Sequence, residues 1–231
     1  YSFYTKSDTE VIVHLYDEFG DQFVEHLRGM FAIALWDGRR KRLILARDRV
    51  GEKPLYYFTD GKQLLFGSEL KALMQSHDVP RDLNLEAVHY YTLYGRVPSL
   101  HCVVCGVRKL PPAHMLIVEN NTVREERYWS LSFKNKLPLS ETDLRAQLLS
   151  RLESSVQSMM VADVPLGAFL SGGVDSSAIV AMMAKHSHAP VETFSIGFHD
   201  EDISELPYAR MVSERFGTRH HEFIIEPNVL D

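Results

Sequence analysis

The chain has 231 residues, of which 45% are hydrophobic and 24% charged, with a formal net charge of -6. This composition is typical of a globular protein of one or two domains, and the mild acidity argues against a nucleic-acid-binding protein, which would carry a basic stripe. Because no apolar run is long enough for a membrane span, no signal peptide pattern opens the sequence and two cysteines cannot form a disulfide framework, we expect a cytoplasmic protein.

The first thirty residues predict two helices. Ser7-x-x-Glu10 has the form of a capping box, in which Ser7 caps a helix and Glu10 reaches back toward it. Apolar residues then recur at helical spacing until Gly20, which ends the helix. We expect a second short helix with three apolar residues along one face, namely Phe23, Leu27 and Met30.

Antiparallel hairpins fill most of the remaining first half. Apolar runs flank two Asp-Gly dipeptides, at 37–38 and 60–61, and such dipeptides favour hairpin turns. Asn84 is suited to cap a helix that runs to Tyr94 and is stopped by Gly95. The predicted strand pairs are 30–36 with 43–46, 55–58 with 63–66, and 115–118 with 122–129, and the run 30–36 is apolar enough to predict a buried strand.

After residue 130 the sequence no longer predicts antiparallel hairpins. Residues 131–139 are polar and include Pro138, as in a linker, and Ser140-x-x-Asp143 is a second capping box. Strands and helices then alternate, which predicts a parallel, doubly wound sheet with a ligand at the carboxyl ends of its strands. We expect strands at 166–170, 191–196 and 220–225 and helices at 144–159, 174–185 and 204–216. The sequence thus predicts an α+β domain at 1–130, a linker at 131–141 and an α/β domain at 142–231.

The most informative segment is S-G-G-V-D-S-S at 171–177, which follows an apolar strand. A strand, a glycine turn and a helix together direct free N–H groups and the positive helix end to one point, where phosphates bind. Gly172 and Gly173 let a phosphate approach the backbone, and Asp175 offers a carboxylate for a phosphate-bound Mg²⁺. Three hydroxyls, those of Ser171, Ser176 and Ser177, add donors. No Lys follows the glycines, so this is not the common G-x-x-x-x-G-K-[ST] loop.

An ordinary turn between a strand and a helix is the alternative interpretation, and a lone Ser-Gly-Gly would favour it. The complete string after an apolar strand is far more specific. It resembles the pyrophosphate-binding loop of the ATP pyrophosphatases, enzymes that cleave ATP between its α and β phosphates and adenylate a substrate. We therefore predict a nucleotide site.

Further motifs resemble those of the glutamine-hydrolysing asparagine synthetases, in the order in which that family has them. They are G-M-F-A-I-A-L-W-D at 29–37, R-D-R-V-G-E-K-P-L-Y-Y at 47–57, S-E-L-K-A-L at 68–73 and K-L-P-P-A-H at 109–114. The resemblance continues through the glycine loop to F-G-T-R-H-H-E at 216–222 and covers essentially the whole chain.

This resemblance implies a two-site enzyme. The first half would be part of an N-terminal-nucleophile (Ntn) glutaminase sandwich, which hydrolyses glutamine to glutamate and ammonia. The second half would begin an ATP-pyrophosphatase domain, where ATP and Mg²⁺ adenylate a carboxylate, typically that of aspartate, and ammonia displaces AMP. A dry tunnel would keep the ammonia neutral and nucleophilic. The family also implies a homodimer.

The resemblance assigns site residues position by position. Asp8 matches the aspartate in S-D-x-E-V that pairs with the α-amino group of glutamine, although an acidic residue in a first helical turn is favourable by itself. Asp175 matches the Mg²⁺ partner. The residues that match the adenosine contacts are Phe169, Leu170 and Ile196, and those of the phosphate loop are Ser171, Gly172, Gly173, Asp175, Ser176 and Ser177.

The family's glutaminase nucleophile is an N-terminal Cys whose own α-amino group serves as the base, and Tyr1 cannot take that part. The family's upstream arginine, its N-G-E segment and its later S-G-E-G-x-D-E loop are also missing. We therefore expect a fragment that carries no catalytic nucleophile and is inactive by itself.

Three other clusters are candidates for chemistry. Cys102-x-x-Cys105 is a single C-x-x-C pair, which is weak evidence for a zinc or redox site. His220-His221-Glu222 resembles a metal cluster, but adjacent residues of a strand point to opposite faces. The run 47–49, Arg-Asp-Arg, is better suited to bracing a hairpin turn than to catalysis. We predict structural roles for the second and third clusters and no metal or redox function for the cysteine pair, whose role the sequence does not indicate.

Asparagine synthetase is the leading interpretation, and two alternatives stay open. An asparagine-synthetase-like amidotransferase would amidate another carboxylate, such as a sugar acid or a cell-envelope component, and the acceptor pocket that separates the two would lie beyond Asp231. A non-catalytic ATP-binding module is the other alternative.

Overall fold

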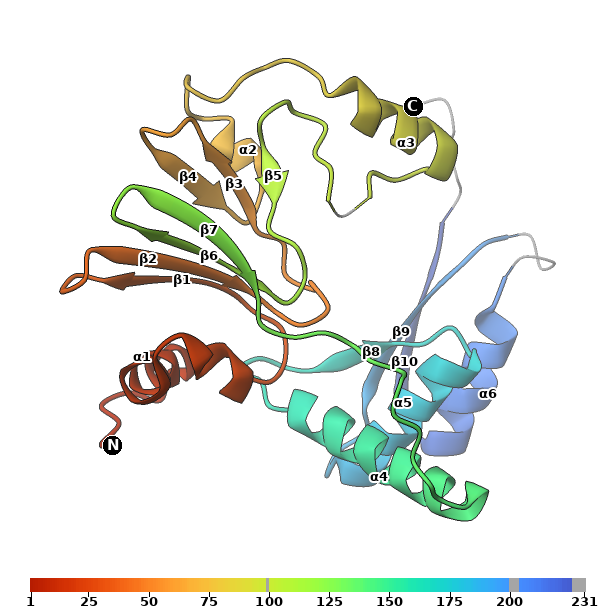
Figure 1. Cartoon of the computed structure of the whole chain (residues 1–231). Coiled ribbons are helices and arrows are strands. Elements are labelled where there is room, and N and C mark those ends of the chain that lie inside the picture. Colours follow the sequence, from red (N-terminus) through yellow and green to blue (C-terminus); the bar gives the residue numbers. More distant parts are fainter. Residues whose placement is uncertain (99, 200–203, 226–231) are drawn as a thin grey trace. The chain divides into compact units, whose positions relative to one another are not determined.

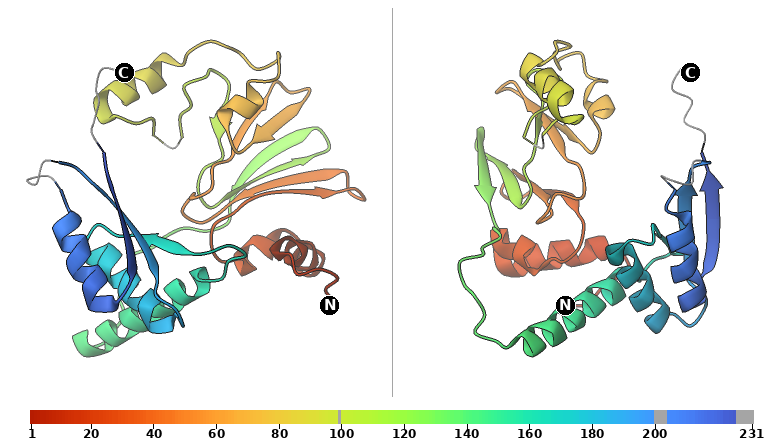
Figure 2. Two further views of the ribbon diagram at one scale, coloured as in Figure 1. Left: turned by 180° about the vertical axis from the view of Figure 1, so that it is seen from behind. Right: turned by 90° about the vertical axis from the view of Figure 1, so that its right-hand side faces the viewer.

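The computed structural model describes residues 1–98, 100–199 and 204–225. The chain divides into two compact units, Tyr1–Asn135 (unit 1) and Lys136–Asp231 (unit 2). Unit 1 combines antiparallel strands with helices, whereas unit 2 combines parallel strands with helices (Figures 1 and 2).

Unit 1 begins with helix α1 (Asp8–Phe19). The hydroxyl of Ser7 accepts a backbone N–H of the first turn, so the predicted N-cap is confirmed. The rest of the predicted capping box is wrong, because the carboxylate of Glu10 accepts the N–H groups of Tyr4 and Thr5, at 2.6 and 2.7 Å. Hydrogen bonds from the Thr5 hydroxyl and the Tyr4 N–H lower the pKa of Glu10 to about 2.

A short 3₁₀ helix, η1 (Gly20–His26), follows directly. It carries Phe23 and Val24, both fully buried, into the core. The prediction of a helix that reaches Met30 is wrong, since the backbone is already extended at Leu27. The apolar spacing of this segment therefore reflects burial and not an α-helical period.

The larger sheet of unit 1 is antiparallel, with its strands in the order β1-β2-β6-β7. Figure 1 shows α1 on one face of this sheet, where Ile44 and Ile117 contribute to a core with the residues of η1. The two predicted hairpins are confirmed, but β1 is an edge strand and Trp36 is 63% exposed, so the expected buried strand is not observed. The strands are β1 (Ala32–Asp37), β2 (Arg42–Arg47), β6 (His114–Glu119) and β7 (Thr122–Arg127).

A second sheet, in the order β4-β3-β5, packs on the other face of the first through apolar contacts such as those of Leu45 and Leu116 with Tyr57. The side chain of Asn84 accepts two N–H groups at the start of α3, and Gly95 ends this helix in the left-handed conformation, as predicted. The sequence pattern does not reveal β5 or α2, because each is too short to show a period. The elements are β3 (Tyr56–Thr59), β4 (Leu64–Gly67), α2 (Leu70–Leu73), α3 (Leu85–Tyr94) and β5 (Arg108–Lys109).

Unit 2 contains a three-stranded sheet in the order β10-β9-β8, and both of its strand pairs are parallel, as predicted. Ser140 caps the first helix, where its hydroxyl accepts the N–H of Asp143 at 3.2 Å. Strands and helices alternate along the chain as the sequence indicates. The elements are α4 (Glu141–Met159), β8 (Gly167–Phe169), α5 (Val174–His186), β9 (Glu192–Gly197), α6 (Leu206–Phe216) and β10 (Arg219–Ile224).

The helices α5 and α6 lie on one face of this sheet, with α4 beside α5 (Figure 2). Thr193 and Ser195 of β9 are buried under the helices, whereas Phe169 and Ile196 on the opposite face are 83% and 52% exposed. The chain crosses the sheet in one direction, from β8 to β9 to β10, and right-handed crossovers then place both helices on one side. The second helical layer of a doubly wound sheet is therefore not among the described elements of unit 2.

Candidate functional site

The glycine loop of unit 2 joins the carboxyl end of β8 to the first turn of α5. Gly173 is the N-cap residue of α5, and no side chain caps this helix. The N–H groups of the first turn therefore lack acceptors within the helix, and the helix dipole adds partial positive charge at the same point. Such a helix start suits an anion, above all a phosphate.

Gly172 has two reasons to be glycine. Its φ of +81° lies in the left-handed region that side chains disfavour. A Cβ atom added there would stand 2.4 Å from Cβ of Tyr208 and 2.6 Å from the backbone nitrogen of Ala209. The first turn of α6 thus packs directly against the loop and fixes its path.

The serines of the motif hold the loop to the start of α5. The hydroxyls of Ser171 and Ser176 lie 3.0 Å apart, and the hydroxyl of Ser177 donates to the carbonyl of Gly173 at 2.7 Å. The N–H of Gly173 donates to the Ser171 hydroxyl at 3.3 Å. Asp175 lies in the exposed first turn of α5 and makes no recorded hydrogen bond or ion pair with the described residues, so its carboxylate is available to a cation.

The apolar residues assigned to a nucleoside lie on opposite faces of the sheet. Phe169 pairs with Phe194, which places Ile196 beside the start of the glycine loop and on the same exposed face as Phe169. The side chain of Leu170 instead lies in the core with Val180. The side chain of Leu170 is therefore not accessible to a ligand, and its backbone N–H donates to the carbonyl of Phe194 at 2.9 Å.

A pocket of about 470 Å³ in unit 1 contains Asp8, at the first position of α1. Other parts of its lining come from β1, from the loop before β3 and from the residue that follows β4, and they include Lys53 and Ser68. A carboxylate and an ammonium group in one pocket match the charges of an α-amino acid. Sequence reasoning identified Asp8 but missed Lys53 and Ser68, although both belong to quoted motifs.

Asp48 links two walls of this pocket. Its fully buried carboxylate accepts the N–H groups of Glu52 and Lys53, both at 3.0 Å, and that of Phe31 at 3.4 Å. Burial raises the pKa of the Asp48 carboxyl, but these backbone hydrogen bonds outweigh it and leave the pKa below its ordinary value. The loop that carries Lys53 is thereby tied to the strand region at Phe31, and both line the pocket.

Comparison with known proteins identifies the family. A model described as "Glutamine amidotransferase domain" matches residues 1–129, and one described as "Asparagine synthase" matches residues 147–230. The protein "Asparagine synthetase [glutamine-hydrolyzing] 3" of Bacillus subtilis (strain 168) is 35% identical over 97% of the chain. The chain belongs to the glutamine-hydrolysing asparagine synthetase family.

Other asparagine synthetases are similarly related. "Putative asparagine synthetase [glutamine-hydrolyzing] 2" of Methanocaldococcus jannaschii is 34% identical over 95% of the chain, and "Asparagine synthetase [glutamine-hydrolyzing] 1" of Bacillus subtilis (strain 168) is 34% identical over 98%. The alignments cover 39%, 43% and 36% of the three relatives. The chain thus spans about two fifths of the length of these asparagine synthetases.

The histidines of β10 have structural partners, whereas the two cysteines of unit 1 are unpaired thiols. Within the described residues, no group of His, Cys, Asp and Glu is arranged to hold a metal ion. His220 contacts Thr193 at 2.9 Å under the helices, whereas His221 stacks on Phe194 on the opposite face, so the predicted alternation is confirmed. Cys102 is buried and Cys105 half-buried, both as free thiols.

Arg47 and Arg49 brace backbone, as predicted. The guanidinium of Arg47 donates to the carbonyls of Gly51, Lys53 and Leu110, each at 2.7 Å. Arg49 donates to the carbonyls of Leu27 and Glu25, at 2.7 and 2.9 Å. Together with Asp48, they fix the loop that follows β2.

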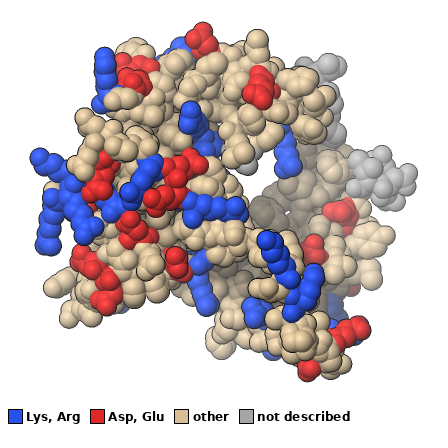
Figure 3. Space-filling view, in the orientation of Figure 1, with Lys and Arg blue, Asp and Glu red and all other residues tan. Residues whose placement is uncertain are grey.

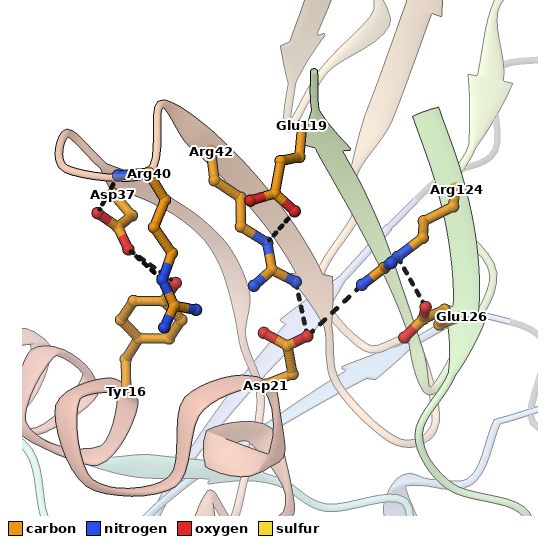
Figure 4. Close-up of polar contacts among 8 residues, drawn as sticks. All are labelled: Tyr16, Asp21, Asp37, Arg40, Arg42, Glu119, Arg124 and Glu126. Atoms are coloured by element: carbon orange, nitrogen blue, oxygen red, sulfur yellow. Dashed lines mark hydrogen bonds and ion pairs between the residues drawn. The ribbon is translucent and has the colours of Figure 1, made fainter. Parts of the chain in front are cut away.

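Figure 4 shows a second braced region of unit 1, where charged side chains join η1 to the larger sheet. The buried Arg42 lies 2.6 Å from Asp21 and 3.8 Å from Glu119, and Arg124 approaches the same Asp21 oxygen at 3.7 Å. On the face shown in Figure 3, basic and acidic side chains are interleaved over unit 1. The ion pairs drawn in Figure 4 thus tie η1 to β2 and β7.

In the part of the chain that the structure describes, no helix combines the length and the apolar composition needed to cross a membrane.

Proposed function

We propose that the protein is an ATP-dependent, glutamine-hydrolysing amide ligase. In this proposal, unit 1 belongs to a glutaminase that releases ammonia from glutamine. Unit 2 belongs to a synthetase domain in which ATP adenylates aspartate, and ammonia then displaces AMP to give asparagine. The names of the relatives and the two family models support both halves of this assignment.

The observation that carries the proposal is the uncapped start of α5 behind the S-G-G-V-D-S-S turn. The ATP phosphates would bind the N–H groups of this turn and the hydroxyls of Ser171, Ser176 and Ser177. Phe169 and Ile196, exposed beside the loop, would flank the adenosine.

Mg²⁺ fits the proposed site because Asp175 provides an exposed carboxylate oxygen with no recorded partner among the described residues, and oxygen ligands suit this cation. When bound, Mg²⁺ would neutralise phosphate charge. Asp175 would hold the ion close to the start of α5, and Gly172 and Gly173 would let the phosphates approach the backbone.

In unit 1, the Asp8 carboxylate would bind the α-amino group of glutamine, and Lys53 in the same pocket would attract its α-carboxylate. No residue of this sequence is proposed as the glutaminase nucleophile, a part that belongs to an N-terminal Cys in this family. Tyr1 lacks the thiol that such chemistry requires.

Two packed antiparallel sheets with helices on their outer side support an Ntn-type glutaminase domain at 1–130, and the parallel sheet supports an ATP-pyrophosphatase-type domain at 142–231, with a linker at 131–141. A cytoplasmic homodimer is proposed from the family alone. An acceptor other than aspartate is less well supported, because the relatives described above are named asparagine synthetases.

Calorimetric titration of the chain with ATP, with and without Mg²⁺, tests the nucleotide site. We expect saturable binding that Mg²⁺ strengthens, and Asp175→Asn should weaken the Mg²⁺-dependent part about tenfold because a charged oxygen ligand is lost. Asp163→Asn, a control at an exposed aspartate in the loop before β8, should bind like the unaltered chain. Absence of ATP binding, or equal Mg²⁺ dependence in both variants, would contradict the proposal.

A further inference from the structure

Unit 1 contains another pocket, of about 550 Å³, which none of the assignments above uses. It is formed by the start of β3, the end of α3 with the residues that follow it, and β5. It shares Pro54 with the Asp8 pocket but includes neither Asp8 nor Lys53. It is therefore a separate place for a ligand.

The charged side chains that line this pocket are all cationic, namely Arg47, Arg96 and Lys109. No Asp or Glu is among the lining residues, although the whole chain carries a net charge of -6. Positive groups that gather in a concave site without counter-charges raise the local concentration of anions. The charge of the pocket lining is thus positive, whereas the net charge of the whole chain is negative.

Among the residues that the structure describes, neither Arg96 nor Lys109 has a carboxylate partner. Within the described residues, Arg96 makes no recorded hydrogen bond or ion pair. The Lys109 ammonium lies 5.7 Å from the ring centroid of Tyr56, a cation–π contact that leaves its N–H donors free for an anion. Arg96 is exposed and Lys109 half-buried, so both can be reached from solvent.

The third cation is fixed and buried. Arg47 is 8% exposed, and its guanidinium is held by backbone carbonyls instead of by a carboxylate. Burial lowers the pKa of Arg47, yet a guanidinium stays protonated in proteins. Arg47 therefore keeps a positive charge at all pH values of interest. Because Arg47 is buried, solvent screens its charge less than it screens the charges of Arg96 and Lys109.

Two tyrosines complete the pocket. Tyr56 and Tyr94 line it with phenol rings, and Tyr94 is supported by Tyr90, whose ring lies 6.2 Å away at an angle of 22°. Ring faces suit the carbon skeleton of a small organic molecule, and hydroxyl groups suit its oxygens. A metal cation is disfavoured by the same set of groups.

We infer that this pocket binds a small dianion, either a phosphate ester or a dicarboxylate. Arg96 and Lys109 contact its oxygens, and Arg47 contributes long-range attraction from the floor. A planar guanidinium binds either oxyanion in a bidentate manner, so the two ligand classes share one chemistry. None of its three cations is used in the glutamine or ATP assignments above.

The test is titration of the 231-residue chain with inorganic phosphate and, separately, with succinate, at constant ionic strength so that non-specific screening does not change. Calorimetry measures affinity, and the backbone amide signals of residues 94–97 and 109 in NMR spectra report the location. We expect saturable binding of at least one probe with shifts at these residues. Selective binding of phosphate assigns a phosphate ester, and selective binding of succinate assigns a dicarboxylate.

Variants decide whether the named cations are responsible. Arg96→Gln and Lys109→Gln should each weaken binding about tenfold, because each removes a charge-assisted contact. Arg39→Gln and Lys62→Gln remove exposed cations elsewhere in unit 1 and should leave the affinity unchanged. Circular dichroism checks that all variants fold. No saturable binding of either probe, or equal affinity in the pocket and control variants, would overturn the inference.

Discussion

At the scale of single residues, the candidate sites depend on ligand-binding side chains and on side chains, such as Asp48, whose hydrogen bonds to backbone groups fix the surrounding loops. Asp8 and Asp175 are proposed ligand-binding groups, and a motif can identify such residues because it records residue type and spacing. Lys53 could not be identified in this way, because only the folded chain brings it into the same pocket as Asp8. Strand pairing and the hydrogen bond from the Lys53 N–H to the Asp48 carboxylate determine its position. Sequence reports the groups, whereas the fold decides which of them share a pocket.

Asp48→Asn should destabilise unit 1 by about 2 kcal/mol, because the amide places a donor among backbone N–H groups that need an acceptor. Trp36 and Trp129 both lie in unit 1, so tryptophan fluorescence during urea unfolding measures this effect. Asp17→Asn, at an exposed position of α1, is the matched control. Equal unfolding midpoints for the two variants would show that Asp48 is dispensable.

At the scale of elements, local signals predicted most helices and hairpins. The Asp-Gly turns, the caps at Ser7, Asn84 and Ser140, and the alternation in unit 2 all depend on residues close in sequence. The two-residue strand β5 and the 3₁₀ form of η1 are too short for a period to be recognised. The direction in which the chain winds across the sheet of unit 2 is a property of strand order, which no local pattern encodes.

Gly172→Ala tests the packing of the glycine loop against α6. The added Cβ would overlap the backbone of Tyr208, so we expect unit 2 to lose about 1–3 kcal/mol of stability and ATP affinity to fall. Gly217→Ala is a control with similar backbone strain, at φ +63°, but with no atom within 4 Å of the new Cβ. Circular dichroism during urea unfolding and ATP calorimetry on both variants measure the difference. ATP affinity that falls equally in the two variants would refute the packing argument.

At the scale of the whole molecule, the stability of both units should depend on pH in the acid range. Carboxyl groups with a lowered pKa include Glu10 at about 2, Asp48 with its backbone donors, and Glu153 beside Lys185. Such groups bind protons more weakly in the folded than in the unfolded state. Their stabilising effect is complete above the unfolded pKa and is lost as the pH falls through the folded value.

We therefore expect the urea midpoint to stay level between about pH 7 and pH 5 and to fall below about pH 4.5, where unfolded carboxyl groups begin to bind protons. Circular dichroism at constant ionic strength follows both units, and fluorescence follows unit 1 alone. A midpoint at pH 3 equal to that at pH 6 would contradict the assigned shifts.

The pairing of β2 with β6 has a consequence for how unit 1 is made. Between these neighbouring strands the chain builds the entire second sheet, and Arg47 reaches a carbonyl 63 positions ahead of it. During synthesis, β2 can pair with β1 as soon as both have left the ribosome. The other edge of β2 stays unpaired until β6 has also emerged. Closing so long a loop costs more entropy than closing a hairpin. The nascent chain is thus exposed to edge-to-edge association during that interval.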